Sequence, residues 1–386
     1  MSAAALLEGK RICVCAGSGG VGKTTTSAAI ALGMAARGAK VAVVTIDPAK
    51  RLAGALGLEE LGNKPRLVEP ERLSSGGLEL RGELWAMMLD PKRTFDELIE
   101  RLAPDPLTAE EILANRVYRE LSTAVAGSQE FTAVSKLYEL DREYDFDLLV
   151  LDTPPSRNAL DFLDAPGRLN SFLEGHMLRM FVRPTGLGMR IIGRGSGVLA
   201  AGLQRVTGLD LLADISTFFR LLGSMTEDFR MRAAEVETML RASTTAFLLV
   251  TSAEHEPIEE AIWFRRTLRE SGLPFAGVII NRVHHDILGA GERSLSLREE
   301  IIAALEADLG GELAARVAEN FHDYHVLARR DERNISRLVP DGDGEPPMLV
   351  PHFDDDVHDV EGLLRVHRYL FASAADRARM IADVVA

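Results

Sequence analysis

The chain has 386 residues, of which 46% are hydrophobic and 26% are charged, and its formal net charge is -14 at pH 7. This length allows a large buried core, in two domains or in one domain with a sizeable insertion. The acidic balance argues against wholesale nucleic-acid binding, so we expect no nucleic-acid partner.

The N-terminal residues contain neither a basic start nor a long apolar stretch, so no secretory signal is predicted. The sequence also lacks a charge-free apolar run of about 18 residues, as a membrane span would need. Cys13 and Cys15 lie two apart on a predicted strand and therefore point to the same face. We interpret them as core thiols in a reducing compartment, and we expect a cytoplasmic protein, with peripheral membrane association left open.

The stretch GSGGVGKTTT, residues 17–26, lies between an apolar run at 11–16 and an Ala-rich helical pattern at 27–37. It fits G-x-x-x-x-G-K-[ST] in the strand–turn–helix context of a phosphate-binding loop. Glycines let backbone N–H groups approach a phosphate chain, and the helix N-terminus adds its positive end. The predicted nucleotide-binding residues of this loop are Gly17, Ser18, Gly19, Gly20, Val21, Gly22, Lys23, Thr24 and Thr25.

The loop residues have distinct expected roles toward ATP and Mg²⁺. Lys23 is expected to contact the outer phosphates and to act in catalysis, and the Thr24 hydroxyl to ligate magnesium. Thr25 can donate to an inner phosphate. The alternative is a glycine-rich turn that binds nothing, which is disfavoured because strand, motif and helix occur in the right order.

The rest of the chain alternates strand and helix, which predicts a doubly wound, mostly parallel α/β sheet. Asp47 and Asp152 both lie at the carboxyl ends of predicted strands, where ligands bind in such sheets. The predicted strands are 41–46, 84–89, a run ending at Asp152, 245–252, 277–281 and 348–350. The predicted helical stretches are 92–144, 257–271, 297–337 and a closing helix from 357.

The chain resembles the family of arsenite-pump and tail-anchored-protein-targeting ATPases, within the larger group of dimerising P-loop ATPases. The resemblance is carried by GSGGVGKTT at 17–25, TIDPAKRL at 45–52, VLDTPPSRNALDFL at 150–163 and IINR at 279–282. It implies an ATP-hydrolysing domain formed by 1–167 and 243–386, which changes the shape of a dimer. It also implies a helical insertion at 168–242, to which 92–144 can add a further helical part.

Two carboxylates are matched by this resemblance. Asp47 resembles the aspartate that positions or activates the attacking water, although Asp47-Pro48 also suits a helix N-terminus. Asp152 resembles the residue that holds magnesium, together with Thr24, and its alternative is simple strand termination.

Three residues resemble the adenine site of the family. Asn281 matches an adenine-reading amide, with a turn-forming asparagine as the rival interpretation. Pro351 and Phe353 match a late loop that packs on the adenine, but a proline and a phenylalanine after a strand can also be ordinary packing.

The sequence departs from the family at two places. Cysteine sites for zinc or a metalloid cannot be built from Cys13 and Cys15 on a buried strand. Ser18 occupies the position of a lysine that reaches the nucleotide of the partner subunit, and serine brings no charge. This predicts slow hydrolysis in a homodimer, a substitute such as Lys50, or a heterodimer with a lysine-bearing paralogue.

The segment 168–242 is unusual in composition for so acidic a chain. It holds six of the 12 methionines, and residues 168–205 contain six arginines against the single acid Glu174. A Met-rich, Arg-flanked surface suits a hydrophobic client or a membrane-associated protein, through a groove of Met180, Leu187, Phe218 and Met225. The alternative is an ordinary helical core. Competing roles for the whole chain are an energising subunit of an anion or arsenite exporter and a slow regulatory switch.

Overall fold

The computed structural model describes residues 2–46, 51–74, 77–119, 128–153, 209–286, 294–338 and 346–385. They divide into two compact units. The sheet unit comprises the described residues within Met1–Met88, Asp145–Ala159 and Ala242–Ala386, and the helical unit those within Leu89–Tyr144 and Leu160–Arg241. The domain boundaries at 168 and 242 stay a prediction, and each unit is taken separately below.

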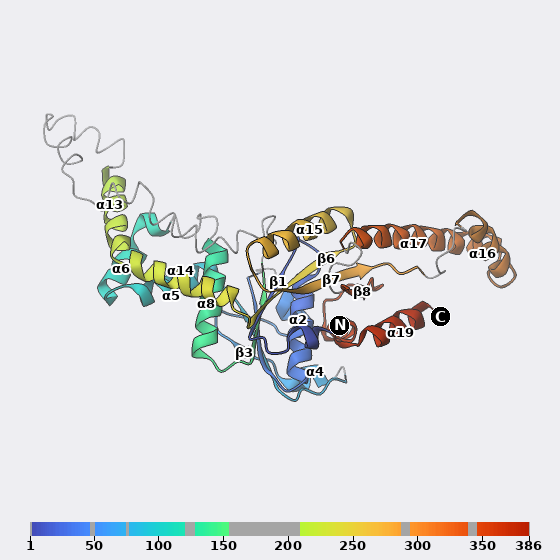
Figure 1. The fold of residues 1–386 in the computed structure, drawn as a ribbon, viewed down its shortest axis with the longest axis horizontal. Coiled ribbons are helices and arrows are strands. Elements are labelled where there is room, and N and C mark those ends of the chain that lie inside the picture. Colours follow the sequence, from blue (N-terminus) through green and yellow to red (C-terminus); the bar gives the residue numbers. More distant parts are fainter. Residues whose placement is uncertain are drawn as a thin grey trace. The chain divides into compact units, whose positions relative to one another are not determined.

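The sheet unit is built on an eight-stranded sheet with the order β3-β4-β2-β5-β1-β6-β7-β8 (Figure 1). Its neighbouring strands pair in parallel, except that β3 is antiparallel to β4. The mostly parallel α/β sheet is therefore confirmed. The strands are β1 (Ile12–Ala16), β2 (Lys40–Thr45), β3 (Arg66–Leu67), β4 (Glu83–Met88), β5 (Leu148–Asp152), β6 (Thr245–Ser252), β7 (Phe275–Val283) and β8 (Met348–Pro351).

The central strands are buried along their whole length, as expected for a parallel sheet covered on both faces. Every residue of β1, β5 and β6 is buried. The register pairs Asp152 of β5 with both Cys15 of β1 and Thr45 of β2. The carboxyl ends of three strands thus meet at one edge of the sheet, directly before the phosphate-binding loop.

Helices cover both faces of this sheet, with α2 on one side and α15 on the other (Figure 1). The contact of α2 with α18 is so close that a Cβ added to Gly33 would lie 2.1 Å from the ring of Phe371. The doubly wound arrangement is confirmed. The helices of this unit are α1 (Ala3–Leu6), α2 (Lys23–Ala36), α3 (Arg51–Ala55), α4 (Pro70–Ser74), α15 (His255–Glu270), α16 (Ser294–Leu309), α17 (Gly311–Leu338), α18 (Val360–Phe371) and α19 (Ala374–Val385).

Three predicted helical stretches are interrupted. The stretch 297–337 is a hairpin of α16 and α17, because Gly310 between them has a φ of 79°, which ends a helix. The closing helix is also two helices, and Ser373 starts the second by accepting a hydrogen bond from the backbone N–H of Asp376. The stretch 92–144 starts with a helix capped by Asp90, and Asp105-Pro106 begins a new helix within it; both helices have an aspartate cap and a proline in the first turn.

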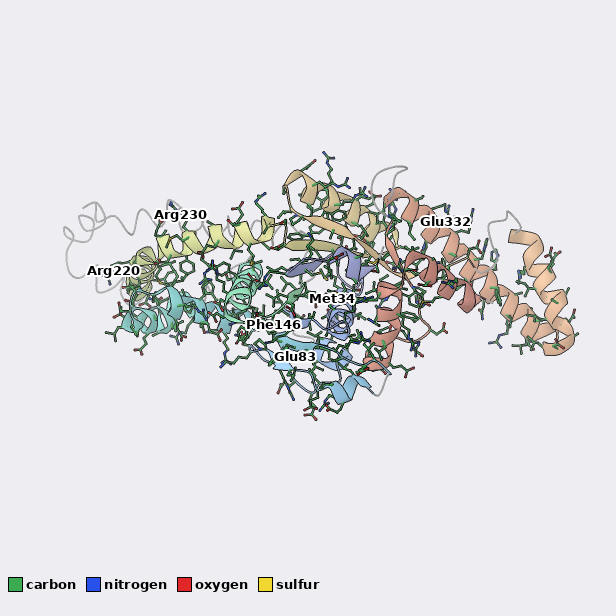
Figure 2. All side chains as sticks on the ribbon, turned by 60° about the horizontal axis from the view of Figure 1, so that its bottom comes forward. Met34, Glu83, Phe146, Arg220, Arg230 and Glu332 are labelled. Atoms are coloured by element: carbon green, nitrogen blue, oxygen red, sulfur yellow. The ribbon has the colours of Figure 1, made fainter. Side chains whose placement is uncertain are left out.

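The helical unit has its own apolar core. Phe218 and Met225 are 4% and 0% exposed within it, together with Tyr118 and Phe229. They do not line an open groove, and that part of the groove prediction is wrong; Met180 and Leu187 lie outside the described residues. The polar faces carry exposed side chains such as Arg220 and Arg230 (Figure 2). The described helices are α5 (Pro91–Leu102), α6 (Pro106–Ala114), α8 (Ser128–Glu143), α13 (Leu209–Ser224) and α14 (Thr226–Arg241).

Across the described ranges of both units, every helix is too short or too polar to cross a lipid bilayer.

Candidate active site

The phosphate-binding loop joins the end of β1 to the start of α2, as the motif predicts. Gly17, Gly20 and Gly22 have φ values of 153°, 79° and 92°, which disfavour any residue with a Cβ. A Cβ at Gly17 would lie 1.9 Å from the carbonyl oxygen of Val250, and one at Gly22 would lie 2.2 Å from Nδ2 of Asn281. The glycines are thus required both by backbone conformation and by close contact with β6 and β7.

Lys23 is the first residue of α2, and its side chain turns back over the loop. Its Nζ atom donates a hydrogen bond of 2.7 Å to the carbonyl oxygen of Ser18, and the residue is 6% exposed. Helix α2 begins four residues earlier than the Ala-rich pattern at 27–37 indicates. The loop therefore delivers Lys23, Thr24 and Thr25 on the first helical turn, the end of a helix that favours anions.

A cavity of about 770 Å³ lies over this turn. Its volume is in the usual range for small-molecule sites, roughly 300 to 1,000 Å³. From the loop it is lined by Gly19, Gly20, Gly22, Lys23, Thr24 and Thr25. From the other side it is lined by Asn281, Arg282, His352 and Phe353, together with Asp355 and Asp356. Cationic and amide groups thus share one cavity large enough for a nucleotide.

Asp152, the last residue of β5, and Thr24, in the first turn of α2, are in contact. The Thr24 Oγ1 atom donates to Oδ2 of Asp152 at 2.6 Å, and Thr45 Oγ1 donates to the same oxygen at 2.8 Å. Asp152 is 1% exposed. A hydroxyl and a carboxylate in contact are hard oxygen donors of the kind that Mg²⁺ prefers, so this pair fits the expected metal. The sequence pointed to Thr24 and Asp152, whereas Thr45 was missed although it ends the neighbouring strand.

Asn281 lies within β7 and is 8% exposed. Its Nδ2 atom donates a 3.0 Å hydrogen bond to the carbonyl oxygen of Val21 in the loop. Because Asn281 belongs to a strand, the interpretation as a turn-forming asparagine is wrong. The amide faces the cavity and ties the end of β7 to the phosphate-binding loop.

The late loop contributes to the cavity through His352 and Phe353. The Phe353 ring packs against Tyr369 of α18 at a centroid distance of 5.9 Å. Pro351 is buried as the last residue of β8, where it pairs with Val283. Of the two expected packing residues, Phe353 therefore lies on the cavity wall and Pro351 lies in the sheet behind it.

Residues 47–50 lie outside the described residues, so Asp47 and Lys50 are not placed. Strand β2 ends at Thr45, which is paired with Asp152. The chain thus enters the segment 47–50 from the edge of the sheet at which Thr24 and Asp152 meet.

A comparison with known families shows to which family the chain belongs. A profile described as "Anion-transporting ATPase" matches residues 10–327, which include the phosphate-binding loop, Asp152 and Asn281. The chain belongs to the anion-transporting ATPase family. It is accordingly an ATP hydrolase, and the resemblance seen in the motifs is confirmed.

Similar members of the family are distant in sequence. The ATPase GET3 of Malassezia globosa is 26% identical over 277 residues, which are 70% of this chain and 71% of that protein. The ATPase get3 of Schizosaccharomyces japonicus is 30% identical over 161 residues, or 41% of this chain and 44% of that protein. The ATPase ARSA1 of Chlamydomonas reinhardtii is 25% identical over 317 residues, which cover 75% of this chain but only 37% of that protein.

The two cysteines of this family member are core thiols, as predicted. Both are 0% exposed on β1, and their Sγ atoms lie 3.9 Å apart. The hydrogen bond to Cys15, followed by burial, raises the pKa of the Cys13 thiol well above its ordinary value. Buried thiols that stay protonated are poor ligands for soft metals and metalloids.

Arg282 ends the matched segment IINR, but no role is predicted for it from the sequence. It has a φ of 57°, the one positive value among the described non-glycine residues. Its guanidinium group donates to the carbonyl oxygen of Gly20 at 3.3 Å. A strained backbone of this kind costs roughly 1 to 3 kcal/mol and is found most often at functional sites. Its sequence signal was its place in IINR, directly after Asn281.

A histidine pair supports the wall of the cavity beside Arg282. The rings of His284 and His352 stack with centroids 4.8 Å apart. The Nδ1 atom of His284 lies 2.8 Å from Oδ2 of Asp331, which is 1% exposed on α17. Burial, with the neighbouring His284 and Arg282, lowers the pKa of His352. The shift favours the neutral form of the His352 ring at the wall of the cavity.

Proposed function

We propose that the chain is a Mg²⁺-dependent ATPase whose nucleotide cycle changes the shape of a dimer and controls the binding of a hydrophobic client or a protein partner. The observation that carries the nucleotide part is the hydrogen bond from Thr24 to the buried Asp152, beside the cavity that Lys23 and Thr24 line. The dimer and client parts rest on the relatives named GET3 and on the composition of 168–242.

The residues of the site would divide the work of phosphoryl transfer. Lys23 would exchange its bond to the Ser18 carbonyl for the outer phosphates, and the N–H groups of the loop and of the first turn of α2 would bind the phosphate chain. Thr24 and Asp152 would hold Mg²⁺, which when bound neutralises charge on the phosphates. Thr45 would keep the Asp152 carboxylate oriented. Asp47 would position the attacking water.

The opposite end of the cavity would hold the base. Asn281 offers an amide that can donate and accept, and Phe353 offers an apolar surface for stacking. His352, held by its stack on His284, adds a second ring near Phe353. This arrangement supports adenine as the base, with Pro351 acting from behind as a rigid support of the loop.

The dimer is proposed to be a heterodimer. Ser18 supplies no positive charge to a partner's nucleotide, so an efficient cycle needs Lys50 or a paralogous subunit that retains the lysine. In such a pair, the site of this chain would receive the partner's lysine.

The client surface is proposed to lie within 168–242, outside the core of the helical unit. Met231 on α14 is 51% exposed, in contrast to the fully buried Met225. An exposed methionine on a helix that also carries exposed arginines suits an adaptable contact with an apolar helix. An exporter subunit is the second candidate, favoured by the family description and by the relative named ARSA1. The buried thiols argue against a cysteine-based metalloid site in it.

A synthetic apolar helical peptide, labelled for fluorescence anisotropy, tests the client proposal. We expect binding to the whole chain that differs between ADP and a non-hydrolysable ATP analogue. Met231→Glu should weaken the binding, and Glu237→Gln, on the same helix, should leave it unchanged. Nucleotide binding without any peptide binding in either state would reject the client and leave the exporter and the switch. Removal of 168–242 is unsuitable as a test because Phe229 of α14 belongs to the core of the helical unit.

A further inference from the structure

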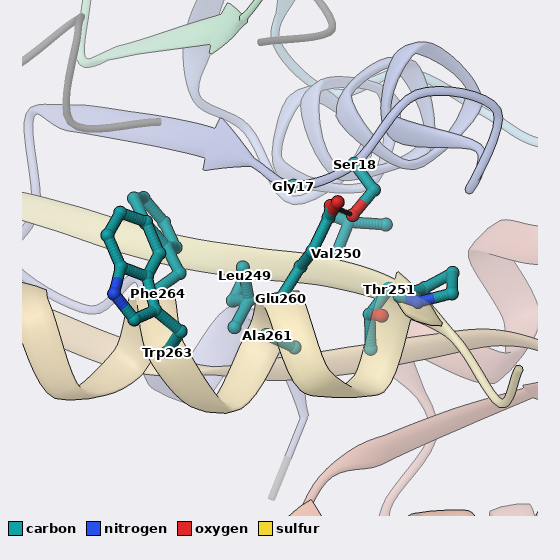
Figure 3. Close-up of a pocket in the computed structure, with 10 residues that line it drawn as sticks. Gly17, Ser18, Leu249, Val250, Thr251, Glu260, Ala261, Trp263 and Phe264 are labelled. Carbon is teal, nitrogen blue, oxygen red and sulfur yellow. Dashed lines mark hydrogen bonds between the residues drawn. The ribbon is translucent and has the colours of Figure 1, made fainter. Parts of the chain in front are cut away.

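Ser18 links the phosphate-binding loop to a carboxylate that lies outside the motif. Its hydroxyl donates a hydrogen bond to Oε2 of Glu260, on helix α15, and Figure 3 shows the two side chains pointing toward one another. The carbonyl oxygen of the same Ser18 accepts the 2.7 Å bond from Nζ of Lys23. Ser18 thus makes hydrogen bonds with both Lys23 of the loop and Glu260 of α15.

The position of Glu260 is fixed by the packing of its helix. The next residue, Ala261, is 2% exposed, and Phe264, one turn further on, is 4% exposed. These contacts set which face of α15 is turned to the sheet, and Glu260 lies on the part of the helix that reaches the loop (Figure 3). Gly17 allows the close approach, because β6 passes directly beneath it.

Little solvent separates this carboxylate from the loop. Ser18, Glu260 and Trp263 line a small cavity of about 20 Å³. That is room for about one water molecule. Glu260 is partly exposed, so its charge acts on the loop at short range and salt can still screen it.

The negative charge of Glu260 opposes the binding of phosphates by the loop. The backbone N–H groups and Lys23 attract phosphates, whereas a carboxylate beside Ser18 repels them. The hydroxyl that binds Glu260 is neutral, so this hydrogen bond does not cancel the negative charge. The site therefore combines an attractive loop with a fixed repulsive group at its edge.

We propose that Glu260 is a positioning residue of the nucleotide site, which anchors the loop through Ser18 and, by its charge, keeps the affinity for ATP below what the loop alone would give. This inference rests on the nucleotide site assigned above and is independent of the dimer and of any client. Its consequence is faster release of bound nucleotide.

The test is the dissociation constant of Mg-ATP, measured by calorimetry on the whole chain at low and high salt. Glu260→Gln keeps an oxygen acceptor for Ser18 and removes the charge. We expect it to bind ATP roughly fivefold more tightly at low salt, and this gain should shrink at about 0.5 M salt, where exposed charges are screened. Glu256→Gln removes an equal charge one turn earlier on α15 and should leave the affinity unchanged.

Ser18→Ala separates the charge from the hydrogen bond, because it breaks the bond and leaves the carboxylate in place. We expect no gain in affinity from it. Wild-type or weaker affinity of Glu260→Gln at low salt would overturn the proposal, and so would an equal gain in Ser18→Ala. Loss of all ATP binding in Lys23→Ala verifies, independently of Glu260, that the measured site is the phosphate-binding loop.

Discussion

The Oγ1 atom of Thr24 donates to Oδ2 of Asp152 across 2.6 Å, which joins the first turn of α2 to the end of β5. The two residues are 128 positions apart in the chain. Their contact brings together a hydroxyl and a carboxylate, which are oxygen donors of the kind that Mg²⁺ prefers. The same Asp152 oxygen also accepts from Thr45, so three segments of the ATPase meet at one atom.

Asp152→Asn is expected to raise the Mg²⁺ concentration needed for half-maximal ATP turnover by roughly 10- to 100-fold, because an amide is a weaker magnesium ligand than a carboxylate. Thr45→Val should have a smaller effect in the same direction. The matched control is Asp147→Asn, which alters a carboxylate next to the start of β5, where it accepts from the Lys40 N–H. A Mg²⁺ titration that is the same for Asp152→Asn and wild type would remove Asp152 from the metal site.

Asn281→Ala should weaken ATP binding by about tenfold and reduce the preference for ATP over GTP, since it removes both the bond to Val21 and the amide that is proposed to read the base. Asn334→Ala is the control, because Asn334 makes a similar buried bond, of 2.9 Å, to the Ala253 carbonyl. Parallel titrations with the two nucleotides provide the measurement. If ATP and GTP weaken equally, the amide only holds the loop and does not read adenine.

His367 is expected to make the sheet unit less stable in acid. Burial, with Arg37 and Arg368 nearby, lowers its pKa from 6.5 to about 4. Between these values the unfolded chain binds more protons than the folded chain, so the free energy of unfolding falls as the pH drops from 6.5 toward 4. The loss attributable to this group is roughly 3 kcal/mol, at 1.36 kcal/mol for each pKa unit.

The check is denaturant unfolding of wild type and His367→Gln at pH 7, 5.5 and 4.5. The variant should lose part of the pH dependence in this window, whereas His358→Gln, which removes an exposed histidine, should retain it. An unchanged pH dependence in His367→Gln would show that other groups cause the acid sensitivity.

The Ser18–Glu260 contact affects what a lysine at position 18 could do for the nucleotide of a partner subunit. A lysine introduced at position 18 meets Glu260 of its own chain, so Ser18→Lys alone should raise turnover at saturating ATP only slightly. In Ser18→Lys combined with Glu260→Gln, the ammonium group is no longer paired with Glu260, and we expect turnover to rise roughly tenfold or more in a homodimer.

Lys50→Ala should abolish the residual turnover of the wild-type chain if Lys50 takes the place of the missing lysine. Oligomeric state is measured on the same samples, and fast wild-type turnover that none of these changes alters would contradict the argument.

The sequence predicted those parts of the site that depend on local pattern. The loop glycines, Lys23, Thr24 and Asp152 follow from a motif and from strand ends, and parallel strands bring their ends to one edge. The contact between Ser18 and Glu260 could not be predicted, because it depends on the rotation of α15 against the sheet. Phe218 and Met225 were misplaced for a related reason, since a helical apolar pattern does not say whether another helix covers it. The left-handed conformation of Arg282 had no signal, because arginine rarely adopts it.

The central claim is that Lys23 binds ground-state phosphates while Asp47 acts on the attacking water, and paired measurements of ATP affinity and turnover test it most directly. Calorimetry should show that Lys23→Ala loses ATP binding and that Asp47→Asn keeps it close to the wild-type value. Turnover should be lost in both variants, because one cannot bind ATP and the other cannot position the water. Equal loss of ATP affinity in Lys23→Ala and Asp47→Asn would contradict this division of roles.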